Sequence, residues 1–377
     1  MRPVLDYDIQ SRMSTTTKSP KKLLVAAYKA AKKALPMYSH RFSPHKFTLA
    51  QLFACLVLKT FLKTDYRGLA QWLTDCPDLC RVIGLTCVPH FTTFHKASHG
   101  ILALPIAHKL LQQTISMVIK QHYVDQAAID STGLEVGYTS YYFVRRRNVK
   151  GLSAYQSMLY GHYPKLTVIC DCKNHLILSV KTTRGPCPDM ATLIPALQTL
   201  PALITLGTLL ADAGYDSERN HVYARDYRKI RTIIPPKAGR RTNRLPKTKY
   251  RRQMKERFNK KLYGQRAQVE TVFSMIKRRW GTAVRARLFS AQEREMWLMV
   301  LTHNLAVFWV VKELFYRAGS FGFELALFFF EIFVFGLKMG IIGFVLYKSR
   351  EPLKIHFYCK SLQFAPAALS GQNSSSK

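Results

Sequence analysis

Residues 208–216 have the sequence Thr208-Leu209-Leu210-Ala211-Asp212-Ala213-Gly214-Tyr215-Asp216. A short apolar run closed by a turn that contains glycine is typical of a buried strand. Asp212 directly follows the run, where a rigid strand meets solvent, and this position suits a metal ligand. Asp216 instead precedes Ser217 and fits the N-cap of a following helix. We therefore prefer Asp212 to Asp216 as the candidate site residue.

A second apolar run ends in a carboxylate in the same way. Its sequence is Gln126-Ala127-Ala128-Ile129-Asp130-Ser131-Thr132. Asp130 closes the apolar part of this run, whereas Asp125 precedes it and Glu135 lies beyond it, where it is expected to be solvated. Asp130 and Asp212 therefore occupy equivalent positions, each at the end of a predicted strand.

The elements around these two strands predict a mixed fold. Residues 166–170 and 175–180 are apolar strands joined by a turn-like segment, and a further strand at 231–234 ends at two prolines. Helices are predicted at residues 190–200 and 219–227. Strands followed by alternating helices and strands indicate an α/β fold.

A third carboxylate is predicted on a helix. Tyr263, Arg266, Glu270 and Lys277 have offsets of three, seven and fourteen residues. At about 100° per residue, all four side chains fall within an arc of roughly 60°. One helix face then carries one carboxylate among three phosphate-binding groups, which favours a metal ligand placed against nucleic acid. The alternative is a solvated basic face on which Arg266 and Glu270 form an ordinary i, i+4 pair.

The spacing of these four residues resembles the Tyr-Arg-Glu-Lys signature of DDE transposases encoded by bacterial insertion sequences. The Asp-x-Gly-Tyr-Asp ending of residues 212–216 resembles a hallmark of the same family, and residues 126–132 resemble its first catalytic strand. The resemblance covers about residues 40–315. It implies a ribonuclease-H-like catalytic domain preceded by a helical DNA-binding domain.

The resemblance also implies the chemistry. Asp130, Asp212 and Glu270 would be the catalytic residues and would share two metal ions, one generating the nucleophile and one holding the leaving oxygen. Carboxylate ligands suit magnesium, or manganese, because both are hard cations. Tyr263, Arg266 and Lys277 would contact DNA phosphates. No covalent intermediate and no small-molecule substrate are expected.

Asp189 resembles a family position that precedes a helix. It follows the segment Gly185-Pro186-Cys187-Pro188. We interpret it as a plain helix N-cap, with a supporting position behind the metal ligands as the alternative.

The charge of the chain predicts a polyanionic partner. With 57 Lys and Arg against 22 Asp and Glu, the net charge is +35 and the isoelectric point is about 10.1. Lys and Arg are densest at residues 228–261, immediately before Glu270. This density predicts a path of double-stranded DNA into the active site. RNA is an alternative that charge alone leaves open.

The 377 residues predict several regions. Residues 1–45 are basic and polar and are expected to be flexible, and residues 46–120 form a helical DNA-binding domain. There, Thr48 and Gln51 predict a capping box that opens a helix to Leu62. Helices predicted at 66–73 and 92–104 fit either a helix-turn-helix DNA reader or simple bundle packing.

The catalytic domain is predicted at residues 121–315, with a last packing helix from Ala291 to about Lys312. Residues 316–377 form an atypical apolar tail. Its segment 321–347 is long enough to span a membrane, but three internal charges make this costly. We prefer sequence read through past the normal stop of a degraded element, with a packing helix and membrane attachment as alternatives. The expected location is a reducing cytoplasm, because the cysteines suggest no set of disulfides.

The eight cysteines predict no disulfide framework. Cys76, Cys80, Cys87 and His90 are close enough in sequence to suggest zinc, but their spacing is not that of a standard finger. We interpret them as core residues.

The sequence as a whole predicts a transposase that cuts DNA at the ends of an insertion sequence and joins the freed 3′-hydroxyl to target DNA. The family implies a homodimer on the two terminal repeats. One alternative is a metal-dependent nuclease that uses the same three acids without strand transfer. Another is a catalytically inactive DNA-binding remnant.

Overall fold

The structure is a computed structural model. It describes residues 16–119, 122–136, 163–237, 245–312, 342–343 and 358–359. Residues Met1–Lys312 form one compact unit and Glu313–Lys377 a second. In the second unit, β8 (Ile342–Gly343) pairs antiparallel with β9 (Tyr358–Cys359), and the rest of the apolar segment 321–347 lies outside the described residues. Within the described part of the chain, no helix is long and apolar enough to cross a membrane.

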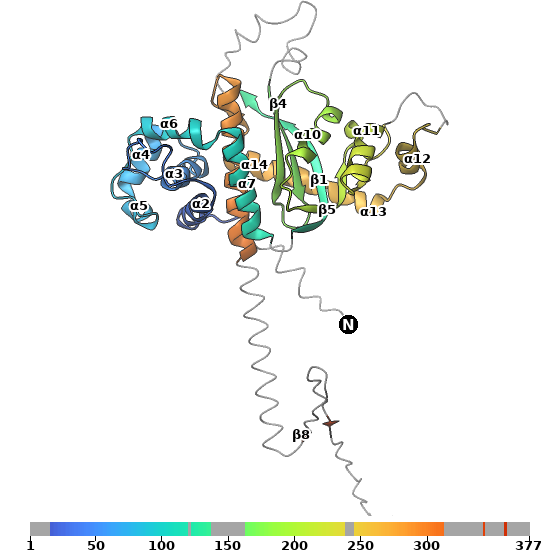
Figure 1. The fold of residues 1–377 in the computed structure, drawn as a ribbon, viewed down its shortest axis with the longest axis horizontal. Coiled ribbons are helices and arrows are strands. Elements are labelled where there is room, and N and C mark those ends of the chain that lie inside the picture. Colours follow the sequence, from blue (N-terminus) through green and yellow to red (C-terminus); the bar gives the residue numbers. More distant parts are fainter. Residues whose placement is uncertain are drawn as a thin grey trace, which may run out of the picture. The chain divides into compact units, whose positions relative to one another are not determined.

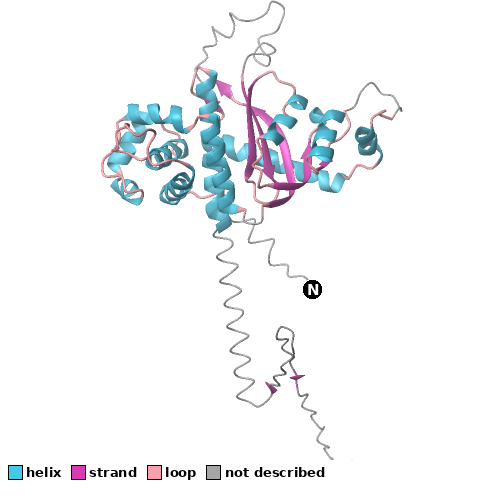
Figure 2. Cartoon of the chain, in the orientation of Figure 1, coloured by secondary structure: helices cyan, strands magenta, loops and turns pink. Residues whose placement is uncertain are grey.

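The first unit is built on a five-stranded mixed sheet (Figure 2). In spatial order its strands are β4 (Ile177–Arg184), β3 (Pro164–Asp171), β1 (Tyr123–Gly133), β5 (Thr205–Ala211) and β6 (Arg231–Ile233). The central strand β1 pairs antiparallel with β3 and parallel with β5. Three antiparallel strands followed by two parallel ones form a ribonuclease-H-like sheet, so the predicted fold class is confirmed.

Helices cover the sheet because the central parts of its strands are apolar and buried. Every residue of β3 is buried, and α10 (Leu193–Gln198) and α14 (Ala267–Trp280) both contact this strand. A short parallel pair, β2 (Glu135–Val136) with β7 (Ala283–Val284), connects the extension of β1 to the segment after α14.

The N-terminal part is helical, as predicted. Its helices are α2 (Pro20–Ala34), α3 (Leu49–Phe61), α4 (Tyr66–Asp75), α5 (Pro77–Val82), α6 (Phe91–Ile101) and α7 (Leu104–Val118). Helix α7 contacts both α2 and β4, and in Figure 1 it stands between the other N-terminal helices and the sheet. Since this part and the sheet share one compact unit, the domain division at residue 120 stays a prediction.

The expectation of a flexible start is wrong for α2. Ser19 caps this helix by accepting a hydrogen bond from the Lys22 amide. Leucines and alanines on one face are completely buried against the rest of the molecule: Leu23, Leu24, Ala26, Ala27, Ala30 and Ala31. Small side chains let α2 lie close to α3, so a lysine-rich segment becomes part of the core through its apolar face.

Other predicted elements are confirmed with changed ends. The Thr48–Gln51 capping box is present, with amide-to-side-chain distances of 3.2 and 2.9 Å. The helix predicted at 92–104 is α6, which ends at Ile101, and α7 begins at Leu104 with Pro105 in its first turn. The helix predicted at 219–227 begins as α11 (Glu218–Val222) and ends in the π-helical turn η3 (Tyr223–Tyr227).

The last helix of the unit spans residues 289–312. Its Asn304 is completely buried. The Asn304 Oδ1 accepts from the Ile177 amide at 2.9 Å, and its Nδ2 donates to the Ile177 carbonyl at 2.8 Å and to Thr114 Oγ1 at 3.1 Å. This side chain was expected to serve packing, and it instead joins β4, α7 and the 289–312 helix through hydrogen bonds.

Of the four N-terminal Cys and His residues that were interpreted as core residues, only Cys80 is buried. Cys76 and Cys87 are half-buried and His90 is exposed, so the interpretation is wrong for these three. Seven described cysteines are free, and no group of three or more His, Cys, Asp or Glu in the described residues could hold a metal ion. Cys80 is buried, and its thiol donates to the Leu73 carbonyl at 3.4 Å.

Candidate active site

The two strand-borne aspartates lie at the same level of neighbouring strands. In the parallel pair of β1 and β5, Ile129 is opposite Ala211, so the next residues are Asp130 and Asp212. Neighbouring strands are about 4.8 Å apart. The Asp130 side chain keeps 22% of its surface exposed, and Asp212 is exposed. Both carboxylates therefore reach solvent at one edge of the sheet.

Asp130 was expected to end its strand, and this detail is wrong. Strand β1 continues to Gly133, because it stays paired with β3 after its pairing with β5 has ended. Asp130 lies opposite Val168, and one of its oxygens accepts from the Ser131 amide at 2.8 Å. The carboxylate is thus held by a continuous strand.

Asp212 begins a tight turn at the end of β5. It caps the 3-10 helix η2 (Ala213–Tyr215) and accepts from the Ala213 amide at 2.7 Å. The turn is anchored by Tyr215, a buried side chain whose hydroxyl is 2.8 Å from the hydroxyl of Ser131. The sequence element Asp-x-Gly-Tyr thus connects the turn after β5 to the strand that carries Asp130.

The four residues of the helical signature do not lie on one regular α-helix. Tyr263 ends α13 (Lys260–Tyr263), Arg266 ends the 3-10 turn η4 (Gly264–Arg266), and Glu270 lies in the first turn of α14. A 3-10 turn has three residues per turn, so the count of 100° per residue fails across it. Arg266 and Glu270 still meet, because they are four residues apart on the helical path.

Arg266 joins two of the candidate acids. One guanidinium nitrogen lies 3.2 Å from Oδ2 of Asp130, and another donates to Oε1 of Glu270. The Arg266 side chain is only 20% exposed, whereas that of Glu270 is 56% exposed. The contact brings the helix-borne acid to the edge of the sheet where Asp130 and Asp212 lie.

The pKa of Asp130 depends on its burial and on the charged groups around it. Burial raises the pKa of Asp130, the Ser131 amide and Arg266 oppose this, and the carboxylates of Asp189 and Asp212 add to the rise. Burial also raises the pKa of Tyr263, and all three candidate acids raise it further. Tyr263 therefore lies within electrostatic reach of the whole group.

The donor chemistry fits a hard divalent cation. Asp130, Asp212 and Glu270 supply carboxylate oxygens, which magnesium and manganese prefer. Among the described residues, however, no three such side chains are gathered closely enough to hold an ion. Because Arg266 contacts both Asp130 and Glu270, a shared ion would require this guanidinium to move.

Asp189 does not cap a helix, because Pro188 occupies that position and Asp189 begins the 3-10 turn η1 (Asp189–Ala191). One Asp189 oxygen lies 2.7 Å from Nζ of Lys165. Lys165 is buried and also donates to the Cys187 carbonyl at 2.5 Å. Together with its effect on Asp130, this geometry favours the supporting position behind the candidate ligands.

Asp216 has a different environment from Asp212. Its side chain is completely buried and it does not cap α11, whose N-cap is Ser217. Arg251 donates to it through Nε at 3.0 Å and Nη2 at 2.9 Å, and the Lys237 amide donates at 2.8 Å. The N-cap interpretation is therefore wrong. Its partner Arg251 could not be chosen from sequence among so many neighbouring cations.

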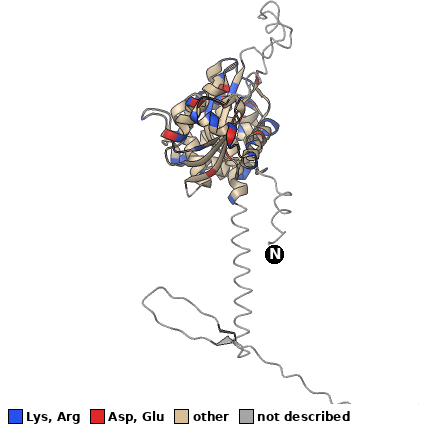
Figure 3. Ribbon diagram, turned by 90° about the vertical axis from the view of Figure 1, so that its right-hand side faces the viewer, with Lys and Arg blue, Asp and Glu red and all other residues tan. Residues whose placement is uncertain are grey.

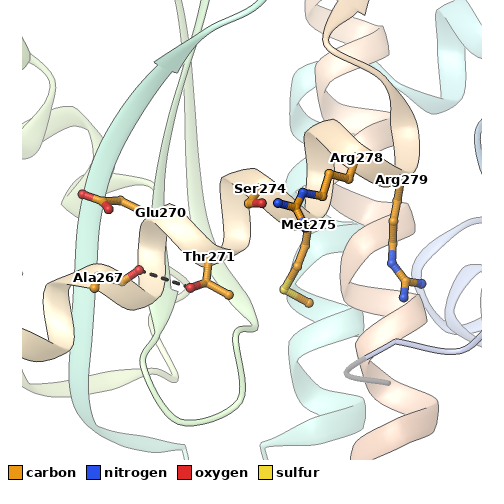
Figure 4. Close-up of a pocket in the computed structure, with 7 residues that line it drawn as sticks. All are labelled: Ala267, Glu270, Thr271, Ser274, Met275, Arg278 and Arg279. Atoms are coloured by element: carbon orange, nitrogen blue, oxygen red, sulfur yellow. Dashed lines mark hydrogen bonds between the residues drawn. The ribbon is translucent and has the colours of Figure 1, made fainter. Parts of the chain in front are cut away.

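An open hollow lies along the outer face of α14. Its volume is about 600 Å³. It is lined by Ala267, Glu270, Thr271, Ser274, Met275, Arg278 and Arg279. Figure 4 shows Glu270 at one end and the two arginines at the other. Lys277 lies in the last turn of α14, and the described residues include no ion pair between it and the acids.

Comparison with known proteins identifies this part of the chain. Residues 125–305 match the family model described as "Transposase DDE domain". The chain therefore contains a transposase DDE domain, and that segment includes Asp130, Asp212 and Glu270.

A search of solved structures gave a match at low sequence identity. It is the cryo-EM structure of a piggyBac transposase synaptic complex with hairpin DNA. It has a TM-score of 0.36 and 10% sequence identity, and the match covers 80% of this chain and 70% of that chain. A search of curated proteins gave no match.

Proposed function

We propose that this protein is a DDE transposase of the insertion-sequence type, which cuts DNA at the ends of its element and joins the freed 3′-hydroxyl to target DNA. The observation that supports this most strongly is the approach of three acids from separate elements. Asp130 and Asp212 follow residues that pair across the neighbouring strands β1 and β5. Arg266 contacts both Glu270 and Asp130. All of them lie within the matched segment.

In this proposal Asp130, Asp212 and Glu270 are the catalytic residues. They would hold two magnesium or manganese ions, which supply an activated nucleophile and neutralise charge on the attacked phosphate. Strand β1 and the capped turn after β5 keep the two aspartates in place. Tyr263, Arg266 and Lys277 would contact phosphates, and Arg266 is suited to this because a guanidinium can bind two phosphate oxygens.

The proposed partner is double-stranded DNA, both terminal repeats and target. The net charge of +35 supports a polyanion, and Lys and Arg recur along the ribbon (Figure 3). The hollow beside Glu270 offers polar side chains, Thr271 and Ser274, and the cation Arg278 along one helix face. A homodimer acting on genomic DNA in a bacterial cytoplasm is part of the same proposal.

A second candidate is a DNA-binding remnant without catalysis. The contacts of Arg266 with both Asp130 and Glu270 favour it, because a guanidinium in that position satisfies the carboxylates that a metal ion would need. The two candidates differ in one observable property, since only the transposase makes new DNA ends.

The test uses a duplex built from the DNA that flanks this gene, incubated with the full chain in magnesium or manganese. We expect metal-dependent nicking at a repeat boundary, followed by joined product. Glu270→Gln should abolish both and leave binding intact, whereas Glu135→Gln, an exposed acid outside the group, should change neither. Nicks without joined product would favour the nuclease, and binding without cleavage would favour the remnant. Cleavage unchanged by Glu270→Gln would overturn the site.

A further inference from the structure

Helix α12 (Lys249–Glu256) is too short and too polar to be stable by itself. Its sequence is Lys-Tyr-Arg-Arg-Gln-Met-Lys-Glu, and only Tyr250 and Met254 are buried. Isolated helices shorter than about 12 residues are marginal in water. The rest of the molecule must therefore hold this helix, and the described contacts show how.

The first contact is the ion pair of Arg251 with Asp216. Asp216 has no exposed side-chain surface and receives three donor contacts from Arg251 within 3.0 Å. A carboxylate removed from water needs such charge-assisted bonds. The pair therefore ties α12 to the segment that directly follows η2 and Asp212.

The second contact is at the start of the helix. The two oxygens of Glu218 accept from the Tyr250 amide at 3.0 Å and the Arg251 amide at 3.1 Å. These amides belong to the first turn, where an α-helix leaves its donors unsatisfied and favours negative charge.

The opposite side of the helix is also held. Arg225 donates through Nη1 to Gln253 at 2.7 Å, and Tyr250 donates to Asp226 at 2.5 Å. Helix α12 is thus attached to α11 and η3 on several sides, while the side chains of its outward face are exposed.

That outward face carries cations. Lys249, Arg252 and Lys255 recur every third residue and are exposed, so they share one side of the helix over about 9 Å. Arg252 forms an exposed ion pair with Glu256, and such pairs exchange readily with other partners because they contribute little. Lys260 and Lys261, also exposed, continue the cations along α13 toward Arg266.

We infer that α12 is a docked cationic surface that binds the sugar-phosphate backbone of duplex DNA beside the active site. Asp216 and Glu218 are positioning residues for this surface, although each carries the charge that repels DNA. The inference rests on the proposed function only for the choice of DNA as the polyanion. It assigns Asp216 a role separate from that of Asp212.

The first experiment measures the salt dependence of duplex binding by the full chain, without divalent metal, by fluorescence anisotropy. The variant Lys249→Gln/Arg252→Gln/Lys255→Gln should lower the slope of log K against log salt by roughly two to three, because each lost phosphate contact contributes about 0.9. A matched control, Lys29→Gln/Lys32→Gln/Lys33→Gln, removes the same charge from exposed positions of α2 and should leave the slope unchanged. Equal slopes for the two variants would overturn the inference.

The second experiment tests the positioning residues by asking whether their substitution strengthens or weakens the binding of duplex DNA. Asp216→Asn removes a negative charge, so bulk electrostatics predicts tighter DNA binding, whereas loss of the Arg251 contact predicts weaker binding by about tenfold. Hydrogen exchange at residues 249–256 should become faster at the same time. If Asp216→Asn does not fold, Glu218→Ala tests the same point, because the half-buried Glu218 accepts from the first amides of α12.

The matched control is Glu256→Gln, which removes an equal charge from the exposed side of the same helix. It should bind DNA as tightly as the parent chain or more tightly. Tighter binding by Asp216→Asn or Glu218→Ala would overturn the positioning role. A duplex RNA of equal length that binds better, with the same loss in the triple variant, would overturn the choice of DNA. Because these measurements need no catalysis, absence of cleavage would count against the proposed function alone.

Discussion

One guanidinium nitrogen of Arg266 lies 3.2 Å from Oδ2 of Asp130, although the two residues are 136 positions apart. The neighbouring contact of Arg266 with Glu270 is local, because these residues are four apart on a helical path. The long-range contact is the one that brings α14 to the edge of the sheet.

Removing this guanidinium should make the site a better cation binder. In Arg266→Gln, Asp130 and Glu270 lose their shared positive partner, so we expect the affinity of the DNA-free chain for Mn²⁺ to rise roughly fivefold, equivalent to about 1 kcal/mol. Electron paramagnetic resonance of free Mn²⁺ measures this directly. Arg252→Gln, on the outer face of α12, is the control, and an unchanged affinity in Arg266→Gln would contradict the prediction.

Asp130 should reduce stability near neutral pH. Because burial raises its folded-state pKa, the folded chain binds a proton more readily than the unfolded chain. The stabilisation that protonated Asp130 provides is therefore present at low pH and is lost as pH rises through the raised pKa. Asp130→Asn should raise the melting temperature at pH 7 by a few degrees, with the gain fading below about pH 4. Thermal unfolding across this range, with the exposed Asp125→Asn as control, tests the sign.

The buried His303 should make the fold sensitive to acid. Burial lowers its pKa from 6.5 to about 4, and its Nε2 lies 2.9 Å from the His175 carbonyl. A depressed histidine pKa stabilises the fold above the unfolded value and loses this contribution as pH falls from about 6.5 to about 4. The effect is at most about 3 kcal/mol. His303→Asn should flatten the pH dependence of urea unfolding in that window, and an equally steep dependence would refute this assignment.

Asn304 should be among the most sensitive polar residues of the core. Asn304→Ala removes three hydrogen bonds and leaves the Ile177 amide and carbonyl unsatisfied in a buried place. We expect the free energy of unfolding to fall by about 2–4 kcal/mol. Gln71→Ala, which removes an exposed bond to Asp75, should cost well under 1 kcal/mol. Similar losses in the two variants would show that Asn304 contributes no more than a surface amide.

Much of the local structure could be predicted from the amino-acid sequence. The strands that carry Asp130 and Asp212 follow from apolar runs with a turn residue behind them, and the Thr48–Gln51 capping box follows from residues three apart. These features depend on interactions between residues a few positions apart, so the local sequence contains both partners of each interaction. Strand ends were less predictable, because β1 continues wherever β3 continues to pair with it.

In the candidate site, too, the local features could be predicted from the sequence and the long-range contacts could not. The residue types, the two strand-borne acids and the Arg266–Glu270 pair were visible in the sequence, since each depends on local spacing. Only the tertiary structure decided that Asp130 and Asp212 share one level, that Arg266 reaches Asp130, and that Asp216 is held by Arg251. The physical reason is that strand register, helix docking and burial are set by contacts between distant segments. Among many similar cations and carboxylates, only the folded chain determines which ones meet.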